Sequence, residues 1–148
     1  MNNEIVQLYD TFEDDYLTIS KKYLQISELE IDNTLMNHSA IYAYFAGLLS
    51  YAKQVRDELS IDLDKQESIT MKKRAAEMAS TGKKVAQTAL NSYVLSVPEI
   101  VELKNKLAKA DGKYTLAKSL VNALDHQKDC LVQISANKRA EAKLFSTN

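Results

Sequence analysis

Few residues of this chain have the type and spacing that metal chemistry needs. His126, Asp129 and Cys130 form the closest set, because positions 126 and 130 lie one helical turn apart and could face one ion. Structural zinc usually takes four ligands with close Cys or His pairs, and the sequence lacks those pairs. We therefore expect no metal here, and we expect a buried thiol at Cys130.

Catalytic and nucleotide-binding patterns are also missing from the sequence. The three glycines are isolated, so there is neither a phosphate-binding loop nor a dinucleotide fingerprint. Acid pairs such as Asp14-Asp15 and Asp57-Glu58 lie on amphipathic segments rich in charge, where carboxylates are solvated. Acid–base catalysis by such a pair needs burial that separates the two pKa values. We expect no enzymatic activity and no cofactor.

A basic cluster is the strongest functional signal. Lys72, Lys73 and Arg74 are consecutive and cover about 200° of a helix surface, and Lys83 and Lys84 follow just past a predicted turn. Such clusters bind phosphates through charge and counterion release, without reading base sequence. A solvated helix face is the alternative interpretation, but several assembled copies would join the clusters into one positive track with high avidity. We therefore predict that these five residues bind DNA.

The distribution of charge along the chain agrees with a polyanionic partner. The net charge is -1 over 148 residues. Residues 1–30 nevertheless carry seven acids and two lysines, whereas residues 69–118 carry ten basic residues and four acids. Such asymmetry favours either a polyanion or contact between acidic and basic surfaces of neighbouring subunits.

The elements that must position these residues are predicted to be helices. Glycine (3) and proline (1) are scarce, which favours an all-α fold over a turn-rich β fold. Residues 4–31 begin as a helix, but 23–31 mix helical and alternating patterns, so a short strand there is an open possibility. No stretch approaches the roughly 20 apolar residues of a membrane span.

A long helix is predicted after the N-cap residues Asp32, Asn33 and Thr34. Its apolar face repeats at steps of three and four: Leu35, His38, Tyr42, Phe45, Leu49, Ala52, Arg56, Leu59 and Leu63. The polar run 62–68 is expected to loosen or end this helix, and residues 80–82 to form a helix end and turn. A shorter helix should cover 83–96, and Pro98 should begin another.

Four aromatic residues gather in the long helix. Tyr42 and Phe45 lie on its apolar face, so we expect them in the core. Tyr44 and Tyr51 lie off that face, and we expect them to be freer to contact a partner, as in base stacking.

The C-terminal helix has the clearest periodicity. Four heptads hold the spacing, and Asp111-Gly112 is the weakest point of the predicted helix, because a mid-helix glycine costs about 1 kcal/mol. Such a period is typical of helices that supercoil around partners. We therefore predict that its apolar residues hold copies of the chain together: Ile100, Leu103, Leu107, Tyr114, Val121, Leu124 and Leu131.

The order of these features resembles the UvsY-type recombination mediators of T-even-like phages. An acidic N-terminal arm, a long helix, the basic Met71–Gly82 segment and a C-terminal heptad helix ending in Lys138-Arg139-Ala140-Glu141 follow one another. Members of that family are helical, assemble into rings and bind single-stranded DNA. They help to load a RecA-like recombinase onto strands covered by single-strand-binding protein.

The resemblance implies functions for named residues. Lys72 and Arg74 stand where the family's Lys-x-Arg contributes to DNA binding, whereas Lys73, Lys83 and Lys84 are added from charge alone. This chain departs from the family pattern by having Ala75-Ala76-Glu77-Met78 where aromatic residues would follow the basic triplet. The departure favours a mainly electrostatic mode of binding.

These observations together predict a recombination mediator. We expect an acidic arm (1–31), a helical DNA-binding region (32–97) and an oligomerisation helix (98–148) in a homo-oligomeric ring of about six or seven copies. We expect no membrane association and a cytoplasmic location, because one cysteine excludes an internal disulfide and the N-terminus does not resemble a signal peptide. The alternative is a phage scaffold or adaptor protein with no nucleic-acid role.

Overall fold

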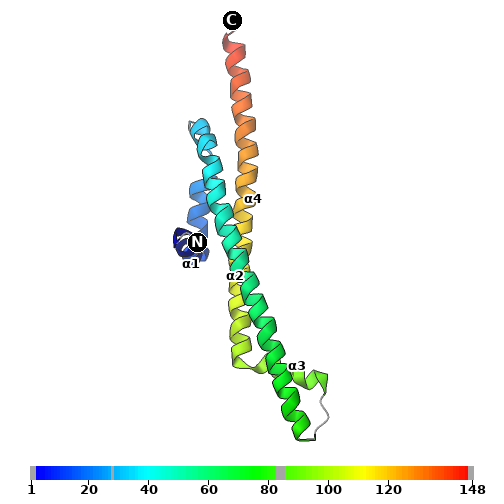
Figure 1. Cartoon of the computed structure of the whole chain (residues 1–148). Helices are drawn as coiled ribbons and strands as arrows, with labels where there is room; N and C mark the ends of the chain where they lie inside the picture. The colour runs from blue at the N-terminus through cyan, green and yellow to red at the C-terminus, as the bar shows by residue number, and fades with distance from the viewer. Residues whose placement is uncertain (1–2, 28, 83–85, 147–148) are drawn as a thin grey trace. The chain divides into compact units, whose positions relative to one another are not determined.

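The computed structural model describes residues 3–27, 29–82 and 86–146 (Figure 1). These residues form α1 (Asn3–Leu24), α2 (Ile31–Ser80), α3 (Gln87–Ser96) and α4 (Pro98–Ser146), and they contain no strand. The all-α fold class is therefore confirmed, and the strand considered for 23–31 is wrong. Its first residues instead complete α1, where the Tyr23 ring packs edge-on against Phe45 at 5.2 Å between centroids.

Helix α2 runs without interruption through the polar run that was expected to end it. Within that run Leu63 is buried while Asp62 and Asp64 face solvent, so the polar residues form the solvent-exposed face of an amphipathic helix. The predicted end at residues 80–82 is confirmed. Gly82 takes a positive φ of 68°, a backbone conformation that glycine adopts without strain.

The C-terminal helix begins at the proline that predicts its start and continues past its one internal glycine. Helix α3 starts at Gln87, and the Lys83 to Val85 part of the predicted helix lies outside the described residues. Helix α4 starts at Pro98 and passes through Gly112 without a break. One mid-helix glycine costs about 1 kcal/mol, and α4 is packed on either side of it, where Ala110 and Ala117 are buried.

The chain divides into two compact units. Unit 1 comprises Met1–Ala52 and Lys113–Asn148, and unit 2 comprises Lys53–Gly112. This division differs from the three consecutive segments expected from the sequence. The difference arises because α2 and α4 each contribute one part to each unit.

The core of unit 1 forms between α1, the first part of α2 and the last part of α4. Its largest fully buried side chains are Phe12, Phe45, Leu48, Leu120, Leu124 and Leu131. Two polar contacts fix the register of α1 on α4: Lys113 Nζ donates to the Tyr9 carbonyl at 2.8 Å, and Gln127 Nε2 donates to the Tyr23 carbonyl at 2.9 Å. Both pairs are 104 positions apart, so α1 and α4 run parallel in constant register.

A buried histidine joins α2 to α4 in the same unit. His38 is 5% exposed, and its Nε2 lies 2.8 Å from the backbone carbonyl oxygen of Leu124. Its ring also stacks on Tyr42. His38 occupies the apolar face that the sequence assigned to it, and hydrogen bonding offsets the cost of burying its polar ring.

The core of unit 2 is smaller. Leu63, Val94 and Ile100 are buried together, with Met71, Val97, Leu103 and Leu107 packed around them. Lys104 Nζ and Glu67 Oε1 form an ion pair at 2.8 Å between α4 and α2. Within each unit the α2 and α4 segments run in opposite directions (Figure 1).

The apolar face of α4 is largely covered by the chain itself. Ile100, Val121, Leu124 and Leu131 are each at most 6% exposed, and Leu103, Leu107 and Tyr114 are half-buried. Packing within one chain therefore explains the heptad spacing, so the spacing no longer argues for partner copies. Self-association through these seven residues stays a prediction. No helix in the described part of the chain is both long and apolar enough to cross a membrane.

Candidate nucleic-acid interface

Packing of α2 in unit 2 determines which of the basic residues face solvent. Met71 packs against the core of this unit, which turns the two residues that follow it outward. Lys72 and Lys73 are both exposed, whereas Arg74 is half-buried. The structure therefore brings two of the predicted DNA-binding side chains to the surface of one helix.

Arg74 is engaged with its own unit. Its Nη1 lies 3.2 Å from Glu77 Oε2, and its guanidinium carbon lies 4.6 Å from the centroid of the Tyr93 ring. Such a cation–π contact between α2 and α3 stabilises their packing by about 0.5–1 kcal/mol at an exposed site. Arg74, the residue that follows Lys73, thus joins α2 to the Tyr93 ring of α3.

Tyr93 is the residue that sequence reasoning missed at this site. It is 40% exposed, and no local pattern links it to the basic cluster because it lies on α3, beyond a turn. An aromatic residue at an exposed position of a short helix is the only sequence signal that could have drawn attention to it.

The two exposed lysines have no ion pair among the residues that the structure describes. Glu77 is the one acid in residues 69–82, and it pairs with Arg74. Lys83 and Lys84 lie outside the described residues. Of the five predicted DNA-binding residues, Lys72 and Lys73 are therefore the ones described as exposed and without an ion pair.

Two other lysines of unit 2 are paired with acids, whereas Lys53, Lys65 and Lys109 are exposed and have no ion pair among the described residues. Lys104 pairs with Glu67, and Lys106 Nζ lies 2.7 Å from Glu102 Oε1. The hydrogen bond from Lys106 and its charge hold the pKa of the Glu102 carboxyl below its ordinary value. The two paired lysines are less available to phosphates than Lys72 and Lys73.

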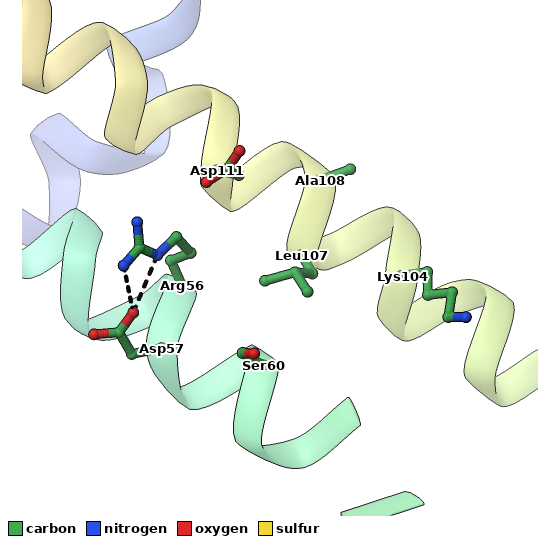
Figure 2. A pocket seen from close by; sticks show the side chains of 7 residues that line it. All are labelled: Arg56, Asp57, Ser60, Lys104, Leu107, Ala108 and Asp111. Carbon is green, nitrogen blue, oxygen red and sulfur yellow. Dashed lines mark hydrogen bonds and ion pairs between the residues drawn. The ribbon is translucent and has the colours of Figure 1, made fainter. Parts of the chain in front are cut away.

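A surface groove of about 530 Å³ lies between α2 and α4 in unit 2 (Figure 2). Its lining contains the charged residues Arg56, Asp57, Lys104 and Asp111 together with Ser60, Leu107 and Ala108. Arg56 donates two hydrogen bonds to Asp57 Oδ1, at 3.0 and 2.7 Å, so their charges are largely neutralised. Balanced, partly paired charges give this groove no preference for either sign of ligand.

The possible metal ligands do not form a site. Across the described residues, no three His, Cys, Asp or Glu side chains come together to hold an ion. Cys130 is exposed, which corrects the expectation of a buried thiol: position 130 lies on the solvent side of α4, next to the buried Leu131.

The burial of the aromatic residues of α2 differs in part from the expectation. Phe45 is buried as predicted, Tyr42 is half-buried, and Tyr44 is 38% exposed. Tyr51, expected to be free, instead meets the Tyr9 ring edge-on at 5.2 Å between centroids. Helix α1 covers this part of α2, which the helical period of α2 alone could not indicate.

A comparison of the chain with family models, with curated proteins and with solved structures finds no match.

Proposed function

We propose that this protein binds single-stranded DNA through the surface around Lys72 and Lys73. The observation that carries the proposal is that both lysines are exposed and without an acid partner among the described residues, while the neighbouring acid Glu77 pairs with Arg74. Ammonium groups in this state exchange counterions for phosphates at the least cost, because no internal ion pair has to be broken.

Tyr93 gives the proposed surface a reason to prefer unpaired bases. Its ring is partly exposed and held by the Arg74 guanidinium. Stacking on an aromatic ring contributes about 1–3 kcal/mol per base and is available in single strands, whose bases are not enclosed in a duplex. The proposed mode is therefore phosphate contact by two lysines, supplemented by one stacked base.

The biological activity that we propose is recombination mediation. The resemblance to UvsY-type mediators supports it, through the order of acidic arm, long helix, basic segment and heptad helix. In this proposal an assembly of several copies holds the strand, displaces single-strand-binding protein and admits a RecA-like recombinase. Multivalency would turn the weak affinity of each pair of lysines into strong binding.

Fluorescence anisotropy with a labelled oligonucleotide tests the interface. At low salt the double variant Lys72→Ala with Lys73→Ala should bind at least about tenfold more weakly than the unmodified protein, whatever the base sequence. The matched control is Lys118→Ala with Lys128→Ala, which removes the same charge from exposed positions of unit 1. Equal losses for both pairs would show only a net-charge effect and would contradict the assignment.

A helical scaffold or adaptor is the second candidate function. Large apolar side chains that are exposed favour it, among them Met36 at 77%, Ile61 at 66% and Leu95 at 55%. Apolar residues at such exposure often mark protein contacts when they gather into a patch. A scaffold would show no binding of the oligonucleotide in the anisotropy experiment at any salt concentration.

A further inference from the structure

A mostly apolar groove lies on unit 1 between α1 and α2. Two adjoining hollows of about 290 Å³ each form it, and both are lined by Tyr23, Tyr44 and Phe45. Ala40 and Ile41 extend the lining along α2, and Leu8 and Ile19 extend it along α1. Because Phe45 is 2% exposed, the floor belongs to the core, whereas Tyr44 at 38% exposure stands at the rim.

The groove is the open side of a three-helix arrangement. In unit 1, α4 is tied to α1 by Lys113 and Gln127 and to α2 by His38, so α4 covers one side of the α1–α2 pair. The opposite side of that pair carries the aromatic lining, and no further helix of the described part of unit 1 covers it. Three packed helices with an apolar groove between two of them can bury that groove under an added helix.

Charge at the rim of the groove is arranged in two opposite patches. Asp15 and Lys22 both line the groove from α1, seven residues apart, which places them on the same helix face about 10 Å from each other. Asp14 adds to the acidic end and Lys21 to the basic end, and all four side chains are exposed. Neither Asp15 nor Lys22 has an ion-pair partner in the part of the chain that the structure describes.

We propose that a second copy of this chain docks on the groove about a two-fold axis. In that arrangement the two α1 helices run antiparallel, so Asp15 of each copy faces Lys22 of the other. A two-fold interface requires such self-complementarity, because each contact between residues i and j recurs as j and i. Tyr44 and Ile41 of the two copies would then bury the apolar lining between the two charge pairs.

The charge pattern favours this occupant over an unrelated basic or acidic helix. A partner helix of one sign would be attracted at one end of the groove and repelled at the other, since Asp15 and Lys22 have opposite charge. An antiparallel copy of the same helix is complementary at both ends. The inference rests on the self-association in the proposed function and names one surface for it; a two-fold interface joins two copies and then closes, so this surface gives a dimer, and a larger ring needs a second contact.

Charge reversal tests the arrangement in the absence of nucleic acid. At tens of micromolar in dilute buffer, light scattering should give a dimer for the unmodified protein. Asp15→Lys and Lys22→Asp, each by itself, should weaken dimerisation on the order of tenfold or more, because each places like charges opposite one another twice. An equimolar mixture of the two variants should regain the dimer, since a mixed pair has opposite charges at both contacts.

The mixture also separates a broken interface from a broken fold, because misfolded chains would not recover on mixing. The control Asp125→Lys changes the same charge at an exposed position of α4 and should leave the dimer intact. A monomeric unmodified protein, unaffected single variants or a mixture without recovery would each overturn the proposal. DNA binding is measured separately, so either proposal can fail while the other stands.

Discussion

Lys72 and Lys73 differ from the other exposed lysines of unit 2 without a described ion pair, Lys53, Lys65 and Lys109, by being consecutive on one helix. Lys104 and Lys106 form ion pairs with nearby carboxylates. Lys72 and Lys73 instead point away from the side of α2 on which Met71 packs against the core. From the sequence alone, Arg74 is expected to have the same role as the two lysines. The structure separates them, because a guanidinium can hold Glu77 and the Tyr93 ring at once.

Tyr9 is the residue whose ionisation is tied most directly to folding. Burial of Tyr9, followed by the neighbouring Tyr51 and Asp10, raises the pKa of its hydroxyl above the ordinary value of 10.0. A folded pKa above the unfolded one means that the neutral form is favoured in the native state. The associated stability is complete below about pH 10 and is lost as pH rises through the folded pKa.

The variant Tyr9→Phe should therefore be less sensitive to alkali. Between about pH 8 and pH 11, the free energy of unfolding of the unmodified protein should fall more steeply than that of Tyr9→Phe, which keeps the ring against Tyr51 but cannot ionise. Urea denaturation followed by circular dichroism measures both slopes. Identical slopes would show that the Tyr9 hydroxyl ionises as it does in the unfolded chain.

At the scale of elements, the spacing of apolar residues predicted the helices but did not predict which segments pack against their apolar faces. The steps of three and four in α2 and α4 correctly identified His38, Phe45, Leu124 and Leu131 as inward-facing. Such spacing indicates only that one face of the helix is buried. A second copy of the chain and another segment of the same chain can bury that face equally well. The contacts that decide between them join residues 86 and 104 positions apart, which local patterns cannot reveal.

Helix ends were predicted well where a residue has a special backbone property. Pro98 and Gly82 mark real boundaries, because one fits a first helical turn and the other takes a positive φ. Polar composition misled the prediction at 62–68, whereas Gly112, the weak point of the predicted C-terminal helix, does not interrupt α4. Both are compatible with a helix whose other face is packed.

Gly112 should accept alanine with a gain in stability. A methyl group added there would meet nothing within 4 Å, so Gly112→Ala should raise the free energy of unfolding by about 1 kcal/mol through helix propensity. Gly82→Ala is the matched contrast, since the positive φ of Gly82 should make the same change destabilising. Thermal unfolding compares the two, and a Gly112→Ala variant no more stable than the unmodified protein would contradict the continuous α4 helix.

At the scale of the whole molecule, the charge asymmetry seen in the sequence is shared between two compact units. The acidic α1 belongs to unit 1, and the basic cluster of α2 belongs to unit 2. The sequence revealed the asymmetry because charge is additive along a chain. It did not reveal the units, because α2 and α4 each cross from one unit to the other within a single helix.

The two proposals give the units separate tasks. Unit 2 would contact the nucleic acid through Lys72 and Lys73, and unit 1 would join copies through the α1–α2 groove. Two copies joined in this way would present two pairs of lysines to one strand, which would raise the effective concentration of the second pair once the first is bound.

The salt dependence of binding to a single-stranded oligonucleotide tests the central claim most directly. The logarithm of the association constant should fall linearly with the logarithm of salt concentration, and each phosphate contact should contribute about 0.7 to the slope. The double variant Lys72→Ala with Lys73→Ala removes two phosphate contacts from each bound copy, so the magnitude of the slope should fall by about 1.4 per copy. A slope that the double variant leaves unchanged, or no binding by the unmodified protein in dilute buffer, would contradict the account.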